Sequence, residues 1–136
     1  MYNLNSALEA LYFAHRALIA KPDAILARHG LSRGHHRILF FVGRNPKLSI
    51  NDLLTKLGVC KQSINAPLRK LQQMGLINSV SDSRDKRIKR LSLSPSGAIL
   101  EDELTEDQRR RLAKAFAAVG GDIEPIWFNM MAELAR

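Results

Sequence analysis

The run from Leu48 to Gly97 constrains the fold more than any other part of the chain. It begins with two short amphipathic segments that are joined by a turn at 58–60. An alternation of apolar and polar residues follows over 76–82, then a charged tip, and then a second alternation up to Leu93. Because helices repeat every 3.6 residues and strands every two, this order predicts helix, turn, helix and a two-stranded hairpin with a basic tip.

A winged helix-turn-helix has this order of elements and places one helix in a DNA major groove with a hairpin beside it. We therefore predict a mainly α fold with a small β-hairpin wing. The length of 136 residues fits a single domain, 1–136. Within it, 31–94 is expected to form the DNA-binding lobe, and 1–30 and 95–136 are expected to form dimerisation helices.

Charge supports a nucleic-acid partner. The chain has 21 Lys and Arg against 13 Asp and Glu, a formal net charge of +8 and an isoelectric point near 10.2. An isoelectric point above about 9 is one mark of a nucleic-acid-binding domain. The basic residues are concentrated between Lys61 and Arg90, where only Asp82 and Asp85 are acidic. This clustering is more informative than the sum.

The predicted helix over 61–74 is the candidate recognition helix. Its apolar stripe is expected to consist of Ile64, Leu68, Leu71 and Met74. The opposite face then carries side chains that can bond base edges or phosphates: Lys61, Gln62, Asn65, Arg69, Gln72 and Gln73. The candidate DNA contacts on this helix are Lys61, Gln62, Ser63, Asn65 and Arg69. Pro67 lies inside this helix and predicts a bend or a loosened turn near 63–67, because proline cannot bond the carbonyl one turn before it.

The predicted hairpin strands are 76–82 and 87–93. Arg84 lies at the tip, where an arginine can enter a minor groove, with Lys86 and Arg87 close by. Asp82 and Asp85 are expected to pair with Arg87 and to fix the shape of the tip. The alternative interpretation is a solvated charged turn, in which a surface ion pair contributes about 0–1 kcal/mol.

Helices are predicted on both sides of this lobe. Helical spacing indicates a first helix over 3–20, interrupted at Pro22 and continued over 23–29, as one kinked helix or two short ones. Further helices are predicted over 33–44 and 50–57, and 48–50 is a candidate third strand. A long helix over 95–119 has a charged middle that is expected to be exposed. A last helix is predicted over 123–135.

The two ends of the chain carry large apolar residues that need cover. The first helix has a broad apolar face, and the last one contains Trp127, Phe128 and Met131 among others. Packing of both ends against a second copy gives a two-fold dimer.

Cys60 precedes the candidate recognition helix, and a helix N-terminus can lower the pKa of a thiol. Redox sensing is therefore one interpretation, and a small residue filling a tight turn is the simpler one. The single cysteine allows no internal disulfide, which fits a reducing cytosol. The four histidines, His15, His29, His35 and His36, lack a metal-ligand spacing, so surface or crevice positions are expected for them.

The sequence gives no support for enzyme activity or for a membrane location. It has no glycine-rich phosphate loop, no Ser-His-Asp set and no zinc-protease motif. It has no apolar run near the roughly 18 residues of a membrane span, and its N-terminus does not read as a signal peptide. No cofactor is expected.

From about Asp23 to its end, the sequence resembles the MarR (multiple antibiotic resistance regulator) family of bacterial transcription factors. The residues that carry the resemblance are the wing, Asp82-Ser83-Arg84-Asp85-Lys86-Arg87, then Leu91-Ser92-Leu93-Ser94-Pro95-Ser96-Gly97, with Gly30-Leu31-Ser32 and the frame Gly58-Val59, Leu71 and Gly75-Leu76-Ile77. The resemblance implies a homodimer, joined through its first and last helices, that binds pseudo-palindromic operators and usually represses. The single cysteine and the lack of a membrane span predict a cytoplasmic location. By position, Lys61, Gln62, Asn65 and Arg69 would lie at the major groove and Arg84 in the minor groove.

The resemblance also implies a small aromatic effector, bound between the dimer helices and the DNA-binding lobe, that lowers DNA affinity. Phe13, Phe40 and Trp127 are candidate crevice residues, although core packing is the simpler role for each. Cys60 and Pro67 depart from the family pattern, which has Ser or Thr and an aliphatic residue there. The alternative function is a winged-helix dimer that uses its basic face for a protein partner, or that binds DNA without sequence preference. The sequence does not indicate the effector, the operator or the sign of regulation.

Overall fold

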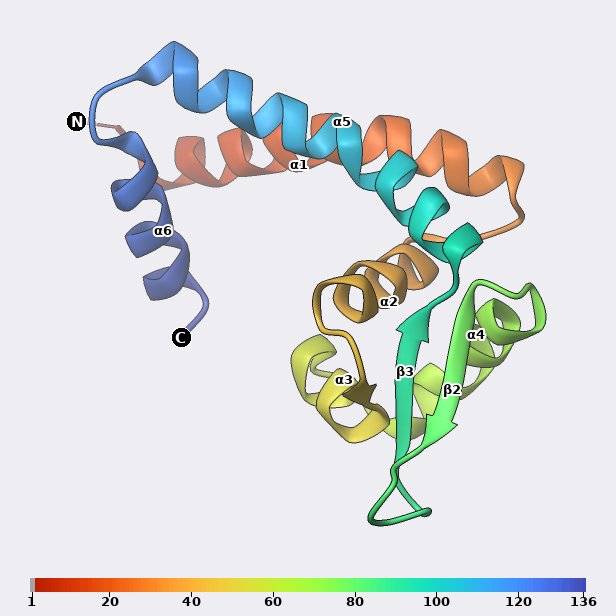
Figure 1. Cartoon of the computed structure of the whole chain (residues 1–136). Coiled ribbons are helices and arrows are strands. Elements are labelled where there is room, and N and C mark those ends of the chain that lie inside the picture. The colour runs from red at the N-terminus through yellow and green to blue at the C-terminus, as the bar shows by residue number, and fades with distance from the viewer. Residues whose placement is uncertain (1) are drawn as a thin grey trace.

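The computed structural model describes residues 2–136 and is mainly helical (Figure 1). Its elements in chain order are α1 (Leu4–Arg28), α2 (Arg33–Arg44), β1 (Leu48–Ser49), α3 (Ile50–Leu57), α4 (Lys61–Gln73), β2 (Ile77–Ser81), β3 (Lys89–Leu93), α5 (Pro95–Val119) and α6 (Ile123–Leu134). This order confirms the predicted winged helix-turn-helix, with α3 and α4 as the helix pair and β2 and β3 as the hairpin.

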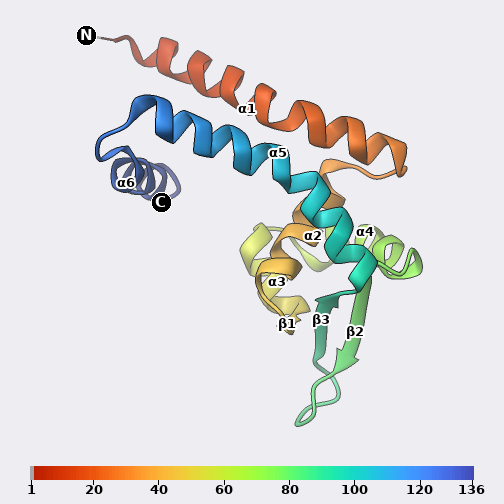
Figure 2. The same cartoon turned by 45° about the horizontal axis from the view of Figure 1, so that its top comes forward.

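The molecule has two layers. The long helices α1 and α5 lie side by side above a lobe made of α2, α3, α4 and the small sheet (Figures 1 and 2). The hairpin points away from the long helices, and α6 turns back from the end of α5. The lobe is therefore held at one end of the helical layer, with its wing projecting from the far side.

Local chemistry explains several element boundaries. The Ser49 hydroxyl accepts a hydrogen bond from the backbone N–H of Asp52 at 3.1 Å and so caps α3. Gly58 ends that helix in the left-handed region, with φ of 66°. Ser94 caps α5 by accepting from the N–H of Gly97 at 3.0 Å, and Pro95 occupies the first turn.

The sheet has the strand order β1-β3-β2, and both pairings are antiparallel. Leu48 pairs with Leu91, which confirms the predicted third strand. The hairpin strands are shorter than the predicted 76–82 and 87–93, because Asp82 and Arg87 belong to the tip loop rather than to the ladder.

Aliphatic side chains from every element of the lobe, together with some from α1 and α5, form the core. Five of them are fully covered by neighbours: Leu39, Leu53, Leu71, Leu91 and Leu104. Ile64 and Leu68 are buried as predicted, whereas Met74 is 40% exposed, because it follows α4 as its cap and leaves the buried stripe. This core fixes α4 with its apolar stripe inward.

The middle of α5 differs from the prediction of an exposed charged segment. Leu104 and Thr105 are buried where α5 packs on α1 and α2. Most charged side chains of this segment are exposed and pair with one another, as Arg109 does with Glu106 at 3.0 Å. Glu101 is half-buried instead and accepts a hydrogen bond from the Thr105 hydroxyl. The helix is therefore amphipathic here, although its composition is dominated by charge.

α1 is one helix that continues through Pro22 instead of two short helices. Proline cannot donate to the carbonyl of the residue four positions earlier, which here is Leu18. The side chain of Gln108 on α5 donates to that carbonyl at 3.1 Å. Pro22 is buried, and the side chain of Gln108 supplies the hydrogen bond that proline cannot make.

The first half of α1 and most of α6 expose large apolar side chains. Leu4 and Leu8 on α1 are 81% and 65% exposed, and Phe128 and Leu134 on α6 are 63% and 62% exposed. These residues lie outside the core of the chain. A search of residues 2–136 for a helix both long and apolar enough to cross a membrane finds none.

Candidate nucleic-acid interface

The outer face of α4 displays the side chains that the sequence placed there. Lys61, Gln62, Asn65 and Arg69 are all exposed. Ile64 and Leu68 face the opposite way, into the core. The burial pattern therefore presents the donors and acceptors of α4 to solvent as one continuous surface, which we call the α4 face.

The turn between α3 and α4 and one long-range contact fix the direction of α4. Cys60, in extended conformation, is the N-cap residue. At the other end, Lys70 donates from Nζ to the carbonyl oxygen of Gly30 at 2.5 Å, at the turn between α1 and α2. This basic residue thus belongs to the scaffold rather than to the α4 face.

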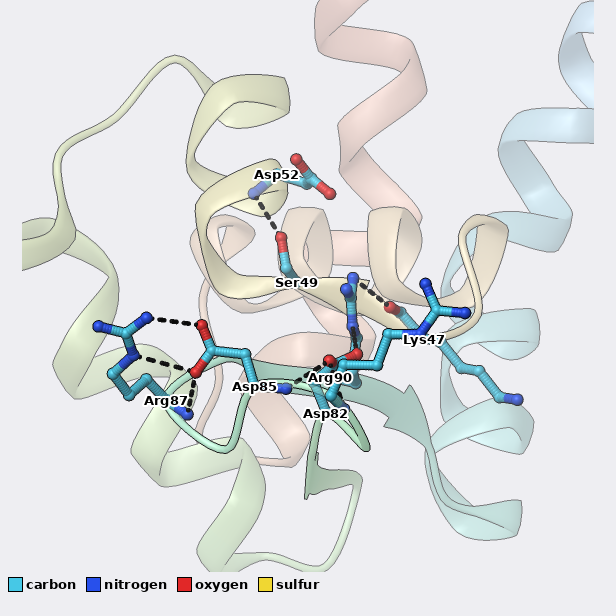
Figure 3. Close-up of polar contacts among 8 residues, drawn as sticks. Lys47, Ser49, Asp52, Asp82, Asp85, Arg87 and Arg90 are labelled. Carbon is cyan, nitrogen blue, oxygen red and sulfur yellow. Dashed lines mark hydrogen bonds and ion pairs between the residues drawn. The ribbon is translucent and has the colours of Figure 1, made fainter.

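The carboxylate of Asp82 organises the wing tip (Figure 3). Its Oδ2 accepts from the backbone N–H groups of Arg84 and Asp85, both at 3.0 Å. These two hydrogen bonds, followed by an ion pair with Arg90, hold the pKa of the Asp82 carboxyl below its usual range. Asp82 therefore stays ionised and holds the loop that presents Arg84.

Asp82 pairs with Arg90 and not with Arg87 as predicted. Arg90 Nε lies 3.2 Å from Asp82 Oδ1, and its Nη1 lies 3.5 Å from the carbonyl oxygen of Lys47 (Figure 3). Lys47 lies in the turn before β1 and has a φ of 65°. Arg90 thus joins the wing tip to the turn between α2 and β1.

Asp85 pairs with Arg87, as the sequence predicted. Both Arg87 Nε and its backbone N–H donate to Asp85 Oδ1 at 3.0 Å, and Nη2 donates to Oδ2 at 2.9 Å. The side-chain hydrogen bonds from Arg87 lower the pKa of the Asp85 carboxyl. Arg87 remains 90% exposed, so its guanidinium is oriented without being covered.

The structure brings the α4 face and the wing to a common groove. This groove has a volume of about 340 Å³ and is lined by Lys61 at the start of α4, by Asn51 and Asp52 at the start of α3, and by Arg87 and Lys89 on the wing. Arg84 and Lys86 are exposed in the tip loop. Of the residues predicted to contact DNA, the groove thus brings together Lys61 and Arg87, and the others are exposed on α4 or in the tip loop.

Cys60 is exposed at the edge of this surface. Its Sγ lies 3.3 Å from the hydroxyl oxygen of Ser63, and this hydrogen bond lowers the pKa of the thiol. Ser63 is therefore engaged with the turn in addition to being exposed on α4. Redox sensing at Cys60 stays a prediction.

Pro67 leaves α4 continuous. The helix runs from Lys61 to Gln73 with the half-buried Pro67 inside it. The predicted bend near 63–67 therefore does not break the helix, and its effect on the α4 face stays a prediction.

A separate pocket of about 250 Å³ lies between α1, α2 and α5. We call it the interhelical pocket. Leu18, Ile19, Pro22, Phe40 and Phe41 form its apolar wall, and His15, Asp23, Arg33, His36, Arg37 and Gln108 form its polar wall. Of the three predicted crevice aromatics, only Phe40 lines this pocket.

Sequence reasoning missed the roles of Arg90 and Gln108. Arg90 was visible only as one of many basic residues, and its contact with Lys47 joins residues 43 positions apart. The role of Gln108 could be predicted only in part. Pro22 inside a helix leaves one backbone carbonyl without its helical donor, so a donor from elsewhere in the chain is expected. Among residues 2–136, no three His, Cys, Asp or Glu side chains are grouped to hold a metal ion.

Comparisons with known proteins agree with this geometry. The sequence model of the MarR family matches residues 29–88. The HTH-type transcriptional regulator PetP of Rhodobacter capsulatus is 45% identical over 117 residues, which span 86% of this chain and 70% of PetP. The similarity to PetP thus covers most of both chains.

Solved structures share the fold at lower identity. NadR in complex with 4-hydroxyphenylacetate matches with a TM-score of 0.78 and 24% identity, over 100% of this chain and 94% of NadR. A variant of S. aureus MepR bound to an oligodeoxyribonucleotide matches with a TM-score of 0.64 and 18% identity, over 99% and 98% of the two chains. The members of this family are regulators of transcription rather than enzymes, and the chain belongs to it: it is a DNA-binding transcriptional regulator of the MarR family.

Proposed function

We propose that this regulator acts as a homodimeric repressor that recognises a pseudo-palindromic operator. The observation that carries the proposal is the α4 face beside a pre-shaped basic wing. Gln62 and Asn65 offer the amide groups that bond adenine, and Arg69 offers the guanidinium that bonds guanine. We assign Lys61 to a phosphate and Arg84 to the minor groove, because a lysine suits the first and an arginine the second. A two-fold dimer presents two such surfaces to two half-sites.

The exposed apolar ends support the dimer. Residues such as Leu8 and Phe128 would be covered by the same elements of a second copy, which is the arrangement of an isologous interface. A hollow of about 640 Å³ between α5 and α6, lined partly by Leu112 and Phe116, lies in the same region. We assign residues 1–30 and 95–136 to dimerisation and 31–94 to DNA binding.

The interhelical pocket supports a small-molecule effector. Its apolar and basic walls suit an aromatic compound with a negative charge. The pocket lies where α1 and α5 meet the lobe through α2, so a bound molecule contacts both layers. Such a ligand would lower DNA affinity by favouring an angle between the layers that does not fit both half-sites.

Selection of bound duplexes from a random DNA pool tests the function. We expect an enriched two-fold site whose affinity falls steeply with salt. If Lys61 and Lys86 each neutralise one phosphate, the dimer makes about four such contacts and the slope of log K against log [salt] is about −4. Enrichment of no site, with weak binding to any duplex, would instead support DNA binding without sequence preference. Absence of all DNA binding would favour a protein partner for the basic face.

A further inference from the structure

His36, in the polar wall of the interhelical pocket, begins a chain of hydrogen bonds that runs from α2 to α5. His36 Nε2 lies 3.1 Å from the hydroxyl oxygen of Thr105. That hydroxyl donates to Glu101 Oε2 at 2.5 Å. Thr105 is only 4% exposed, so the middle of this chain is shielded from bulk water, whereas His36 and Glu101 at its ends are half-buried.

The order of these bonds determines which nitrogen of His36 carries the hydrogen. Thr105 has one hydroxyl hydrogen, and Glu101 takes it, so the Thr105 oxygen accepts from His36. Nε2 of His36 is therefore the donor, and Nδ1 of the neutral ring is an unprotonated acceptor. Across residues 2–136, Nδ1 of His36 has no hydrogen-bond partner. It is the position at which the ring can gain a proton.

The charges around the ring come from three helices. α1 contributes Asp23 and His15, α2 contributes Arg33 and Arg37, and α5 contributes Glu101. Arg33 engages Asp23 through three hydrogen bonds of 2.9 to 3.1 Å, so the Asp23 carboxylate is largely neutralised. Burial, the largest influence on the ring, lowers the pKa of His36, and Arg37 lowers it further, against opposite contributions from Glu101 and Asp23. Without a ligand, His36 is therefore neutral near neutral pH.

We propose that the interhelical pocket binds an aromatic carboxylate together with one proton, which His36 takes up at Nδ1. The inference rests on the proposed effector role of this pocket. Phe40 and Phe41 provide the apolar surface for the ring of the ligand, and the new Nδ1–H donates to its carboxylate. Since the negative charge of the ligand and the proton enter together, the net charge of the pocket is unchanged.

The consequence is a dependence of ligand affinity on pH. The anion raises the pKa of His36 in the complex above its value in the unliganded protein. Affinity therefore rises as pH falls from the pKa of the complex towards that of the unliganded protein, by at most tenfold per pH unit. Outside that window, His36 contributes no pH dependence. The ligand would act most strongly on a regulator in a mildly acidified environment.

Titration calorimetry of the full-length dimer tests the proposal, with 4-hydroxyphenylacetate and benzoate as probes. Measurements in phosphate and Tris buffers, whose ionisation enthalpies differ, give the number of protons taken up per bound probe. We expect net uptake of up to one proton near neutral pH. His36→Gln should abolish the uptake and flatten the pH profile of Kd. His29→Gln, at an exposed position outside the pocket, is the control and should keep both.

Nitrogen NMR of the His36 ring provides a second readout that a purely structural role would not change. The Nδ1 signal should move from an unprotonated to a protonated position on addition of the probe, whereas the Nε2 signal should stay protonated. His15→Gln, in the same pocket, should leave that change in place. A His36→Gln protein with poor folding would not remove this test, because it is made on the unchanged chain.

Three outcomes would overturn the proposal. These are binding of a probe without proton uptake, uptake that persists in His36→Gln, and absence of binding by either probe at millimolar concentration. DNA binding is measured separately and without ligand. Intact operator recognition together with any of these outcomes removes the proton-linked site and leaves the proposed DNA-binding function standing. Loss of operator recognition by the unchanged protein would argue against the proposed function instead.

Discussion

The side chain of Gln108 donates a hydrogen bond to the backbone carbonyl of Leu18, across the contact between α5 and α1. That carbonyl is the one that Pro22 leaves without its helical donor. Two residues 90 positions apart thus restore one turn of α1. Both Leu18 and Gln108 also line the interhelical pocket, so the repair lies at the proposed effector site.

A double-mutant cycle tests this repair. Gln108→Leu should lower the free energy of unfolding by about 1 kcal/mol, because it leaves the half-buried Leu18 carbonyl without a donor. In a Pro22→Ala background, the N–H of residue 22 supplies the donor, and Gln108→Leu should cost little. Denaturant unfolding at one fixed protein concentration measures the free energy of unfolding of all four proteins. If Gln108→Leu lowers it equally with Pro22 and with Ala at position 22, Gln108 acts by packing alone.

Arg84→Ala should weaken operator binding by roughly 1 to 3 kcal/mol, the range for an arginine that reads bases. The side chain is exposed, and the tip is shaped by the Asp82 carboxylate, which the substitution leaves in place. The dimer should therefore be unchanged in sedimentation. Arg110→Ala, an exposed arginine on α5, is the matched control and should keep its affinity. Undiminished affinity in Arg84→Ala would refute the assignment of the wing.

Asp82→Asn should loosen the wing tip without removing any group proposed to contact DNA. The substitution weakens the hydrogen bonds that the side chain accepts from the backbone N–H groups of Arg84 and Asp85, and it removes the ion pair with Arg90. Hydrogen exchange of the amides of residues 84 and 85 should therefore accelerate. Asp122→Asn is the control, because the Asp122 side chain makes no capping hydrogen bond. Exchange that stays slow in Asp82→Asn would show that the ladder alone orders the tip.

Acid should have the same effect on the wing of the unchanged protein. The pKa of Asp82 is lower in the folded chain than in the unfolded chain, where a carboxyl has a pKa of about 3.9. Its contribution to stability is therefore present above that value and is lost as pH falls through the lower, folded-state pKa. In an NMR titration, the loop amides should shift together with the Asp82 carboxyl.

Local signals predicted most of the secondary structure. Ser49, Gly58 and the Ser94-Pro95 pair mark ends of helices through their own backbone bonds, so neighbouring sequence suffices to find them. The α4 face also followed from periodicity, because the core takes the apolar stripe and leaves the rest exposed.

The errors arose where a side chain has a distant partner. Asp82 could have paired with either of two arginines, and only the hairpin register, which places Arg90 opposite Val80, brings Arg90 close. The many charged residues of α5 led to the prediction of an exposed segment. Leu104 and Thr105 are nevertheless buried, because α1 and α2 pack against them. The interhelical pocket combines three helices that no local pattern relates.

Gly97→Ala should destabilise the fold by about 1 to 3 kcal/mol or more, as overpacking does. A Cβ at residue 97 would lie 1.9 Å from the carbonyl oxygen of Leu76, which is rigid backbone at the start of the hairpin. Gly34→Ala on α2 is the matched control, because its Cβ would meet only the Ser32 hydroxyl at 3.7 Å. Thermal unfolding should show a lower Tm for the first variant and an unchanged or higher Tm for the second. A small effect at Gly97 would mean that α5 can shift away from the hairpin.

Pro67→Leu should stabilise the protein and tighten or redirect operator binding. Proline inside a helix costs on the order of 3 kcal/mol relative to alanine, and the half-buried site on α4 can take an aliphatic side chain. The substitution restores an N–H for the Ser63 carbonyl, at the turn that carries Lys61 and Gln62. A change in the angle of that turn alters how the α4 face meets base edges. Denaturant unfolding and duplex selection measure the two effects.

Ala66→Leu is the control for the added side chain, because it enlarges the neighbouring exposed position without changing any backbone donor. If Pro67→Leu raises stability but selects the same operator with the same affinity, the proline loosens α4 without tilting its exposed face. If neither quantity changes, the helix accommodates Pro67 without strain. A new selected sequence in Pro67→Leu alone would show that this proline helps to set which operator the regulator reads.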